Sequence, residues 1–202
     1  MVCSLVMHVW WQIFEQLRLQ LGEKADIKLM IGPARAVDRD MIAEDLDNIR
    51  TGHKPRPEKP LIVVATQCLE AGVDIDLDAL VTEAAPLDAL RQRFGRVNRA
   101  GRDIAAKGSI LITDEQLRKR YADPVYGDAV KACWDWLNKQ YSENDDVLDF
   151  GINGMNARLQ DMDPMALAPM LAERPDAPIL RPVDADTCFQ TAPRPAVATD
   201  LT

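Results

Sequence analysis

The chain has 202 residues, of which 47% are hydrophobic and 28% charged, and its formal net charge is −8. This length supports one domain of about 150 residues with a buried core, plus further segments. The acidic balance excludes a general electrostatic attraction to nucleic acid, so any contact with a polyanion must come from a local cluster of basic residues.

The cysteines and histidines are too few and too scattered to predict a metal site. No two of the four cysteines have CxxC spacing, and the only histidines are His8 and His53. We therefore expect no metal ligands, and reduced thiols in a cytoplasmic protein. The apolar opening from Val2 to Phe14 is too short to cross a bilayer and lacks the basic region of a signal peptide, so we expect no membrane span.

Helical and strand patterns alternate along the chain. In chain order they predict a helix at 12–21, a strand at 27–31, a helix at 38–50, a loop at 51–59, strands at 61–65 and 79–85, a helix at 87–97, a strand at 108–113 and a helix at 125–141. This order favours an α/β fold with a parallel sheet and right-handed crossovers. From residue 164 onward lie seven of the 13 prolines, which predicts an extended or partly disordered tail.

A cluster of arginines carries the strongest chemical signal. Positions 91, 93, 96, 99 and 102 are all arginine, and no acidic residue lies between Asp88 and Asp103. On a helix, Gln92, Arg96 and Arg99 would share one face. Guanidinium groups are planar, always charged and suited to bidentate contact with phosphate. The competing interpretation is a solvated basic helix or a patch that binds a partner, since exposed charge runs are common.

A second motif follows the predicted strand at 61–65. Thr66 and Gln67 stand at its carboxyl end, where ligands bind in open parallel sheets, and they suit contact with a nucleic-acid phosphate. Gly72 would allow a close backbone approach. Asp74 could pair with the arginines or accept a hydrogen bond from a ribose hydroxyl. The acidic residues at positions 76 and 78 fit the start of the next loop at least as well as a functional role.

Together these motifs resemble a known family. The segments 65–76 and 92–99 are similar to motifs V and VI of superfamily 2 helicases. Asn98 and the run that ends at Arg102 favour the CRISPR-associated type I helicase–nucleases over DEAD-box RNA helicases, which usually carry glycine where Asn98 stands. Segment 32–39, which contains Arg35, resembles conserved region IV of the same family. The resemblance covers roughly residues 10–197.

The resemblance implies a fold and a domain order. Residues 1–122 would form the second RecA-like helicase domain, a three-layer parallel sheet flanked by helices whose N-terminal strand is incomplete. Residues 123–163 would form a helical accessory segment, and residues 164–202 a Pro-rich acidic tail.

The resemblance also implies roles for single residues. Gln92, Arg96 and Arg99 would act at the γ-phosphate of ATP. Gly72 and Asp74 would lie near the nucleotide, and Thr66, Gln67 and Arg35 would contact DNA. The implied partners are single-stranded DNA, an upstream helicase/nuclease half and a CRISPR surveillance complex.

The chain contains no Gly-Lys-Ser/Thr sequence, the end of a phosphate-cradling loop. The pair Asp114-Glu115 imitates a magnesium motif but follows the arginines, which is the wrong side. We therefore expect ATP and Mg²⁺ only when another segment completes the site, and no ATP turnover by the chain alone. The alternatives are a catalytically inactive remnant that binds DNA or a complex, and an unrelated α/β protein with a chance arginine helix.

Overall fold

The computed structural model describes residues 2–30, 46–52, 57–66, 74–118, 123–143 and 148–173, and for residues 2–8 it describes the backbone alone. Residues 1–172 form one compact unit, and a second unit begins at Glu173. The proposed domain boundaries after residues 122 and 163 stay predictions.

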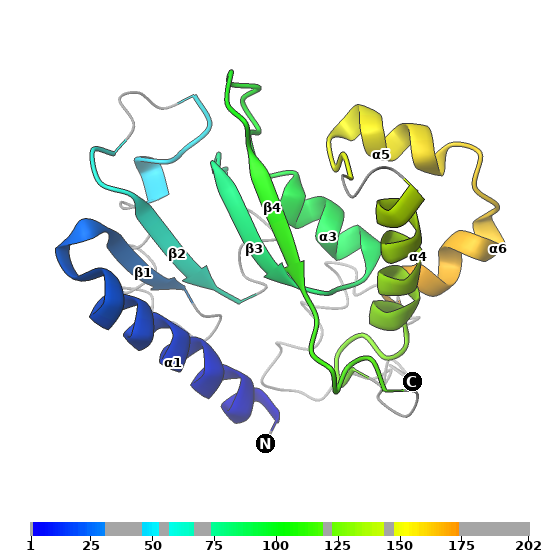
Figure 1. Cartoon of the computed structure of the whole chain (residues 1–202), viewed down its shortest axis with the longest axis horizontal. Coiled ribbons are helices and arrows are strands. Elements are labelled where there is room, and N and C mark those ends of the chain that lie inside the picture. The colour runs from blue at the N-terminus through cyan, green and yellow to red at the C-terminus, as the bar shows by residue number, and fades with distance from the viewer. Residues whose placement is uncertain are drawn as a thin grey trace, which may run out of the picture. The chain divides into compact units, whose positions relative to one another are not determined.

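The described elements follow the order expected for an α/β chain (Figure 1). They are α1 (Val2–Leu21), the 3-10 turn η1 (Gly22–Lys24), β1 (Asp26–Met30), β2 (Leu61–Ala65), β3 (Ala79–Glu83), α3 (Leu87–Phe94), β4 (Lys107–Leu111), α4 (Ala129–Glu143), α5 (Ile152–Leu159), α6 (Pro164–Leu167) and the 3-10 turn η3 (Ala168–Met170).

Among the described residues, two pairs of parallel strands form the sheets, which confirms the parallel arrangement predicted from the sequence. In the first pair β1 runs beside β2, with Asp26 opposite Leu61. In the second pair β3 runs beside β4, with Ala79 opposite Lys107. Figure 1 shows the arrows of each pair pointing the same way.

The N-terminus differs from the prediction. We expected a helix from residue 12 and an incomplete strand before it, whereas α1 is one helix from Val2 to Leu21. The segment has no internal glycine or proline to interrupt its backbone hydrogen bonds. Gly22, with φ +53°, ends the helix as expected.

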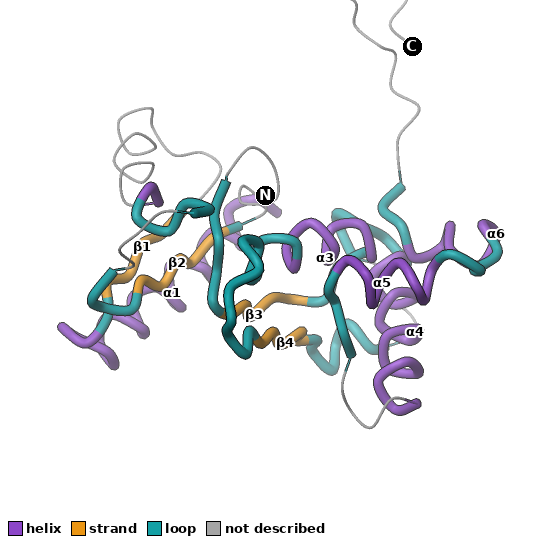
Figure 2. The backbone as a smooth tube through the Cα atoms, turned by 90° about the horizontal axis from the view of Figure 1, so that it is seen from above, coloured by secondary structure: helices purple, strands orange, loops and turns teal. Residues whose placement is uncertain are grey.

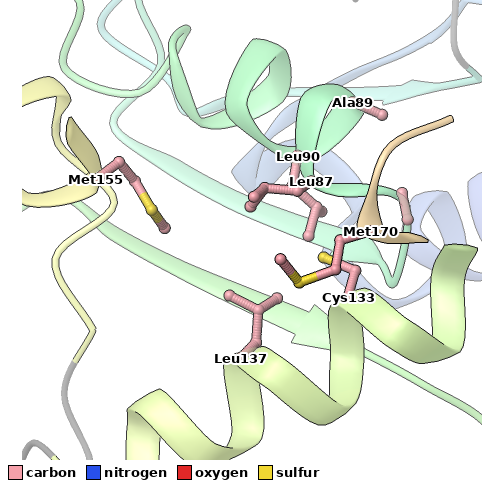
Figure 3. Close-up of a cluster of buried hydrophobic side chains, with 8 residues drawn as sticks. Leu87, Ala89, Leu90, Cys133, Leu137, Met155 and Met170 are labelled. Carbon is pink, nitrogen blue, oxygen red and sulfur yellow. The ribbon is translucent and has the colours of Figure 1, made fainter. Parts of the chain in front are cut away.

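The larger core lies between α3, α4 and the segments that follow α4. Its buried side chains are Ala85, Leu87, Ala89, Leu90, Cys133, Leu137, Met155 and Met170. Figure 3 shows side chains of this cluster from α3 and α4 pointing toward one another, and Figure 2 shows α3, α4 and α5 grouped on one side of the described chain. A smaller cluster joins Leu46, Ile49 and Ile75.

The C-terminal part of the described chain is more regular than predicted. The extended tail was expected from residue 164, but α6 and η3 occupy residues 164–170, and Met170 is only 4% exposed. Asp163 caps α6 by accepting a hydrogen bond from the Met165 backbone N–H at 2.9 Å, and Pro164 starts the helix. Residues 174–202, the rest of the predicted tail, lie outside the described residues.

Candidate functional site

The loop that joins α3 to β4 carries three of the five clustered arginines. We call residues 95–102 the arginine loop. Gly95 ends α3, and its backbone N–H donates to the Arg91 carbonyl at 2.9 Å. Asn98 and Gly101 then take left-handed conformations, with φ +46° and +64°. The predicted helix at 87–97 ends three residues early at Phe94, because Val97 forms a parallel bridge with Leu77 in place of continuing the helix. The left-handed residues that follow keep the helix from resuming.

This early end overturns the predicted helical face. Gln92 lies on α3, whereas Arg96 and Arg99 lie in the arginine loop, so the three do not share one face of a helix. Gln92 instead lines a cavity of about 340 Å³, together with Asp88, Arg91, Gly95, Phe150, Ile152 and Met155. The glutamine is therefore placed by α3, and the two arginines by the loop.

An acidic segment, residues 74–78, holds the arginine loop. The backbone of Leu77 pairs with the loop on both sides: its N–H donates to the Arg96 carbonyl at 2.7 Å, and its carbonyl accepts from the Asn98 N–H at 2.8 Å. On its other side the segment is anchored by the Asp76 N–H, which donates to the Ile49 carbonyl at 2.9 Å. The loop thus lies beside the chain that enters β3, at the amino end of that strand.

Arg102 ties the end of the loop to the same segment. Its Nε donates to Oδ2 of Asp76 at 2.7 Å, and its Nη2 lies 2.5 Å from Oδ1 of Asp78. The Asp76 side chain is fully buried and that of Arg102 is 23% exposed. Burial by itself lowers the pKa of Arg102, but the hydrogen bonds and charges of the two carboxylates outweigh it and raise that pKa above its ordinary value. Asp76 therefore belongs to the loop's support, a role that the sequence did not single out.

Asp74 meets a second arginine at the surface. Its Oδ1 lies 3.7 Å from Nε of Arg99 and accepts a hydrogen bond from Oγ1 of Thr51 at 2.8 Å. Nε of Arg50 lies 4.0 Å from its other oxygen. Of the two expectations for Asp74, pairing with an arginine of the cluster is thus observed, through Arg99. The side chains of Arg99 and Asp74 are 42% and 52% exposed, and pairs this exposed contribute about 0–1 kcal/mol.

Two other arginines of the cluster contact the fold itself. Nη2 of Arg91 donates to Oδ1 of Asn156 in α5 at 3.1 Å. Nη1 of Arg93 donates to Oγ1 of Thr82 at 2.8 Å and to the Glu83 carbonyl at 3.3 Å, which fastens α3 to β3. The cluster therefore divides into arginines that join elements of the fold and arginines that belong to the loop.

The residues predicted to contact DNA are only partly described. Thr66 follows the carboxyl end of β2, as expected, and its backbone N–H donates to the Met30 carbonyl at 3.1 Å. The arginine loop lies instead beside the chain that enters β3. Gln67, Gly72 and Arg35 lie outside the described residues.

The described segments hold neither a metal-binding cluster nor a helix that could cross a membrane. No group of three or more His, Cys, Asp or Glu side chains there is arranged to hold a metal ion. None of the helices within those segments is long and apolar enough to cross a membrane.

The chain matches a known family over half its length. The family model described as "CRISPR-associated nuclease/helicase Cas3, C-terminal" matches residues 1–102, and the match ends at the last residue of the arginine loop. A Cas3 nuclease/helicase of Methanothermobacter thermautotrophicus is 38% identical over 103 residues, which are 49% of this chain and 12% of that protein. A Cas3 endonuclease/helicase of Thermus thermophilus is 41% identical over 88 residues, 40% of this chain and 10% of that protein.

Solved structures agree on the fold. The crystal structure of T. fusca Cas3 has a TM-score of 0.57 at 15% identity and covers 83% of this chain and 22% of that one. The T. fusca Cas3–ATP structure has a TM-score of 0.56 at 16% identity and covers 81% of this chain and 21% of that one. The chain thus spans about a fifth of these structures and about a tenth of the curated relatives.

Proposed function

The chain belongs to the family described as the C-terminal part of the CRISPR-associated nuclease/helicase Cas3, and we propose that it forms the second motor half of an ATP-dependent DNA helicase in CRISPR interference. In this proposal the two strand pairs belong to one RecA-like sheet with helices on both faces. The partners are a segment that carries the ATP-gripping loop, a nuclease and a surveillance complex. The observation that carries the proposal is a fastened arginine loop that holds Arg99 in a weak surface pair with Asp74.

Arg99 is the residue we assign to the γ-phosphate, with Arg96 beside it. The pair between Arg99 and Asp74 is long and exposed, so the guanidinium can leave the carboxylate for a stronger acceptor at little cost. A phosphate oxygen is such an acceptor, because charge-assisted hydrogen bonds from guanidinium to phosphate are short and bidentate. Asp74 then becomes available to a ribose hydroxyl.

When bound, ATP would supply the phosphoryl group and Mg²⁺ would neutralise its charge, and both would be held by the segment that carries the ATP-gripping loop. The contribution of this chain is to place positive charge where negative charge develops, which is worth about 10³–10⁵ in rate for an arginine aimed at a transferring phosphoryl group. Gln92 would approach the same phosphate from α3, and Gly72 would allow close backbone contact.

DNA contact is assigned to Thr66, Gln67 and Arg35. Hydroxyl and amide groups at the end of a strand suit phosphate oxygens, and an arginine adds charge. Because only one of these three residues is basic, few phosphates would be neutralised, and the affinity for single-stranded DNA should fall with salt along a shallow slope.

The test is DNA-stimulated ATP hydrolysis by the motor assembled from this chain and the segment with the ATP-gripping loop. Replacing Arg99 by alanine should lower kcat by about 10³-fold or more, with a smaller effect on KM. Arg118, an exposed arginine outside the loop, provides the matched control, and Arg118→Ala should leave the rate unchanged. Undiminished hydrolysis by Arg99→Ala would contradict the role assigned to Arg99 at the γ-phosphate. Salt-sensitive DNA binding without any hydrolysis would favour an inactive DNA-binding remnant.

A further inference from the structure

We infer that Arg102 is a positioning residue, which sets where Arg99 points by clamping the arginine loop onto the acidic segment 74–78. This inference rests on the proposed function, in which Arg99 acts at the nucleotide. It adds a residue that touches neither nucleotide nor DNA and acts only through the loop.

The clamp has a buried side and an exposed side. The guanidinium of Arg102 reaches Asp76, whose side chain is fully buried, and Asp78, whose side chain is 72% exposed. Nη2 of Arg102 also donates to the Leu77 carbonyl at 3.4 Å, so one side chain contacts three consecutive residues of the segment. A planar fork with five donors can make such contacts together, which the single ammonium of lysine cannot.

Asn98 connects Arg102 to the rest of the arginine loop through two hydrogen bonds. Its Nδ2 donates to the Arg102 carbonyl at 2.9 Å, and its Oδ1 accepts from the Arg102 backbone N–H at 2.7 Å. These two bonds bracket residues 98–102 into a closed turn, and Arg99 is the residue directly after Asn98. The backbone of Asn98 is in turn paired with Leu77. Arg99 therefore sits on a turn that is fixed at both ends to the acidic segment.

The same segment carries the partner of Arg99. Asp74, at the start of the segment, pairs with Arg99, and Asp76 and Asp78, at its end, hold Arg102. The distance from Arg99 to Asp74 thus depends on the clamp two and four residues further along the segment. If the clamp opens, the loop loses its register with the segment and Arg99 loses its direction, although α3 and β4 can remain folded.

The first arm of the test is hydrogen exchange on the purified chain. In Arg102→Gln, peptides covering 95–102 and 74–78 should exchange about tenfold faster, as expected for the loss of a charge-assisted hydrogen bond. Peptides covering α4 should keep their protection. Because Arg102→Gln leaves Asp76 charged and buried, the double variant Asp76→Asn/Arg102→Gln, which leaves no buried charge and lacks the ion pair, is measured as well and should show the same local change. Arg158→Gln, a change in α5, is the control.

The second arm is kinetic and uses the assembled motor. Arg102→Gln should lower kcat by roughly 100-fold, the size expected when a reacting group is displaced by about 1 Å, and leave KM for ATP within about threefold. Arg102→Lys should recover part of that loss. Most tellingly, Arg102→Gln/Arg99→Ala should be no slower than Arg99→Ala alone, because a residue that acts through Arg99 has nothing left to position.

The outcomes separate the two claims. Unchanged exchange of 95–102 in both variants, loss of protection throughout α4 in both, or additive losses of kcat would each overturn the positioning role. If Arg99→Ala leaves hydrolysis unchanged, the proposed function fails, and the exchange arm still decides whether Arg102 holds the loop.

Discussion

Gly108 in β4 lies directly against Phe94, the last residue of α3. A Cβ atom added at Gly108 would stand 2.9 Å from Cζ and 3.3 Å from Cδ1 of Phe94, and closer still to Cε1. The ring has little room to withdraw, because it stacks on Phe150 with ring centroids 4.2 Å apart and planes at 22°. Gly108→Ala should therefore force Phe94 away from Phe150 and strain the end of the helix that leads into the arginine loop.

The magnitude follows from three contributions. Forcing an extra methyl group into a packed site costs about 1–3 kcal/mol. Loss of the aromatic stack adds about 0.5–1.5 kcal/mol. Against this, alanine restricts the unfolded chain more than glycine and offsets about 0.4–1 kcal/mol. Taken at their middle values, these contributions lower the free energy of unfolding by about 2 kcal/mol, and we expect a fall of about 1–3 kcal/mol.

Urea unfolding measures this change. With a slope of about 2 kcal/mol per molar urea, the midpoint should fall by roughly 0.5–1.5 M. Ser109→Ala, at the neighbouring exposed position, is the control and should stay within about 0.5 kcal/mol of wild type. In a Phe94→Leu background, which has no ring against Gly108, the Gly108→Ala substitution should lower the urea midpoint by less than it does in wild type. A midpoint of Gly108→Ala equal to or above that of wild type would refute the packing argument.

Three further predictions concern single residues. Asn98→Gly keeps the left-handed backbone but loses the hydrogen bonds to Arg102, whereas Asn98→Ala loses them and also strains the backbone. In urea unfolding, Asn98→Ala should therefore be less stable than Asn98→Gly by about 1–2 kcal/mol. The reverse order would contradict the assigned turn. Asp163→Ala removes the cap of α6 and should cost about 0.5–2 kcal/mol in the same assay; no change would show that the cap contributes nothing. Burial, with a smaller contribution from Asp88, raises the pKa of Cys133 to about 12. Above about pH 8.5 the unfolded chain loses the thiol proton while the folded chain keeps it. The free energy of unfolding of wild type, relative to that of Cys133→Ala, should therefore fall by roughly 1 kcal/mol per pH unit above that pH. Parallel pH profiles of the two proteins would argue against a buried thiol.

Sequence patterns predicted an element correctly where neighbouring residues in the chain mark its ends. The strand at 61–65 was predicted with its observed bounds, because five apolar residues stand between Pro60 and the polar Thr66. The end of α3 was predicted too late, because Val97 continues the helical spacing. Its backbone instead forms a parallel bridge with Leu77, twenty residues earlier, and that contact is tertiary.

One part of the candidate site, the pairing of Asp74, was predictable from the sequence, and another part, the burial of Asp76, was not. The pairing of Asp74 with an arginine follows from opposite charges in two neighbouring motifs. The sequence did not distinguish Asp76 from Asp74 and Asp78, because aspartate at every second position predicts that all three side chains lie on one face and are equally exposed. The structure buries only the middle one, since its partner Arg102 arrives from a distant loop and compensates for the loss of water.

The left-handed turn at Asn98 also bears on how helicase sequences are compared. Asparagine at this position separated the type I CRISPR helicases from DEAD-box proteins, which usually carry glycine there. Both residues adopt the left-handed conformation readily, so either one suits the backbone of this turn. What asparagine adds is a side chain that grips the backbone of Arg102, which glycine cannot do. In this chain, the choice of asparagine over glycine at position 98 therefore affects how firmly the turn is held to Arg102 and leaves its backbone conformation accessible to both.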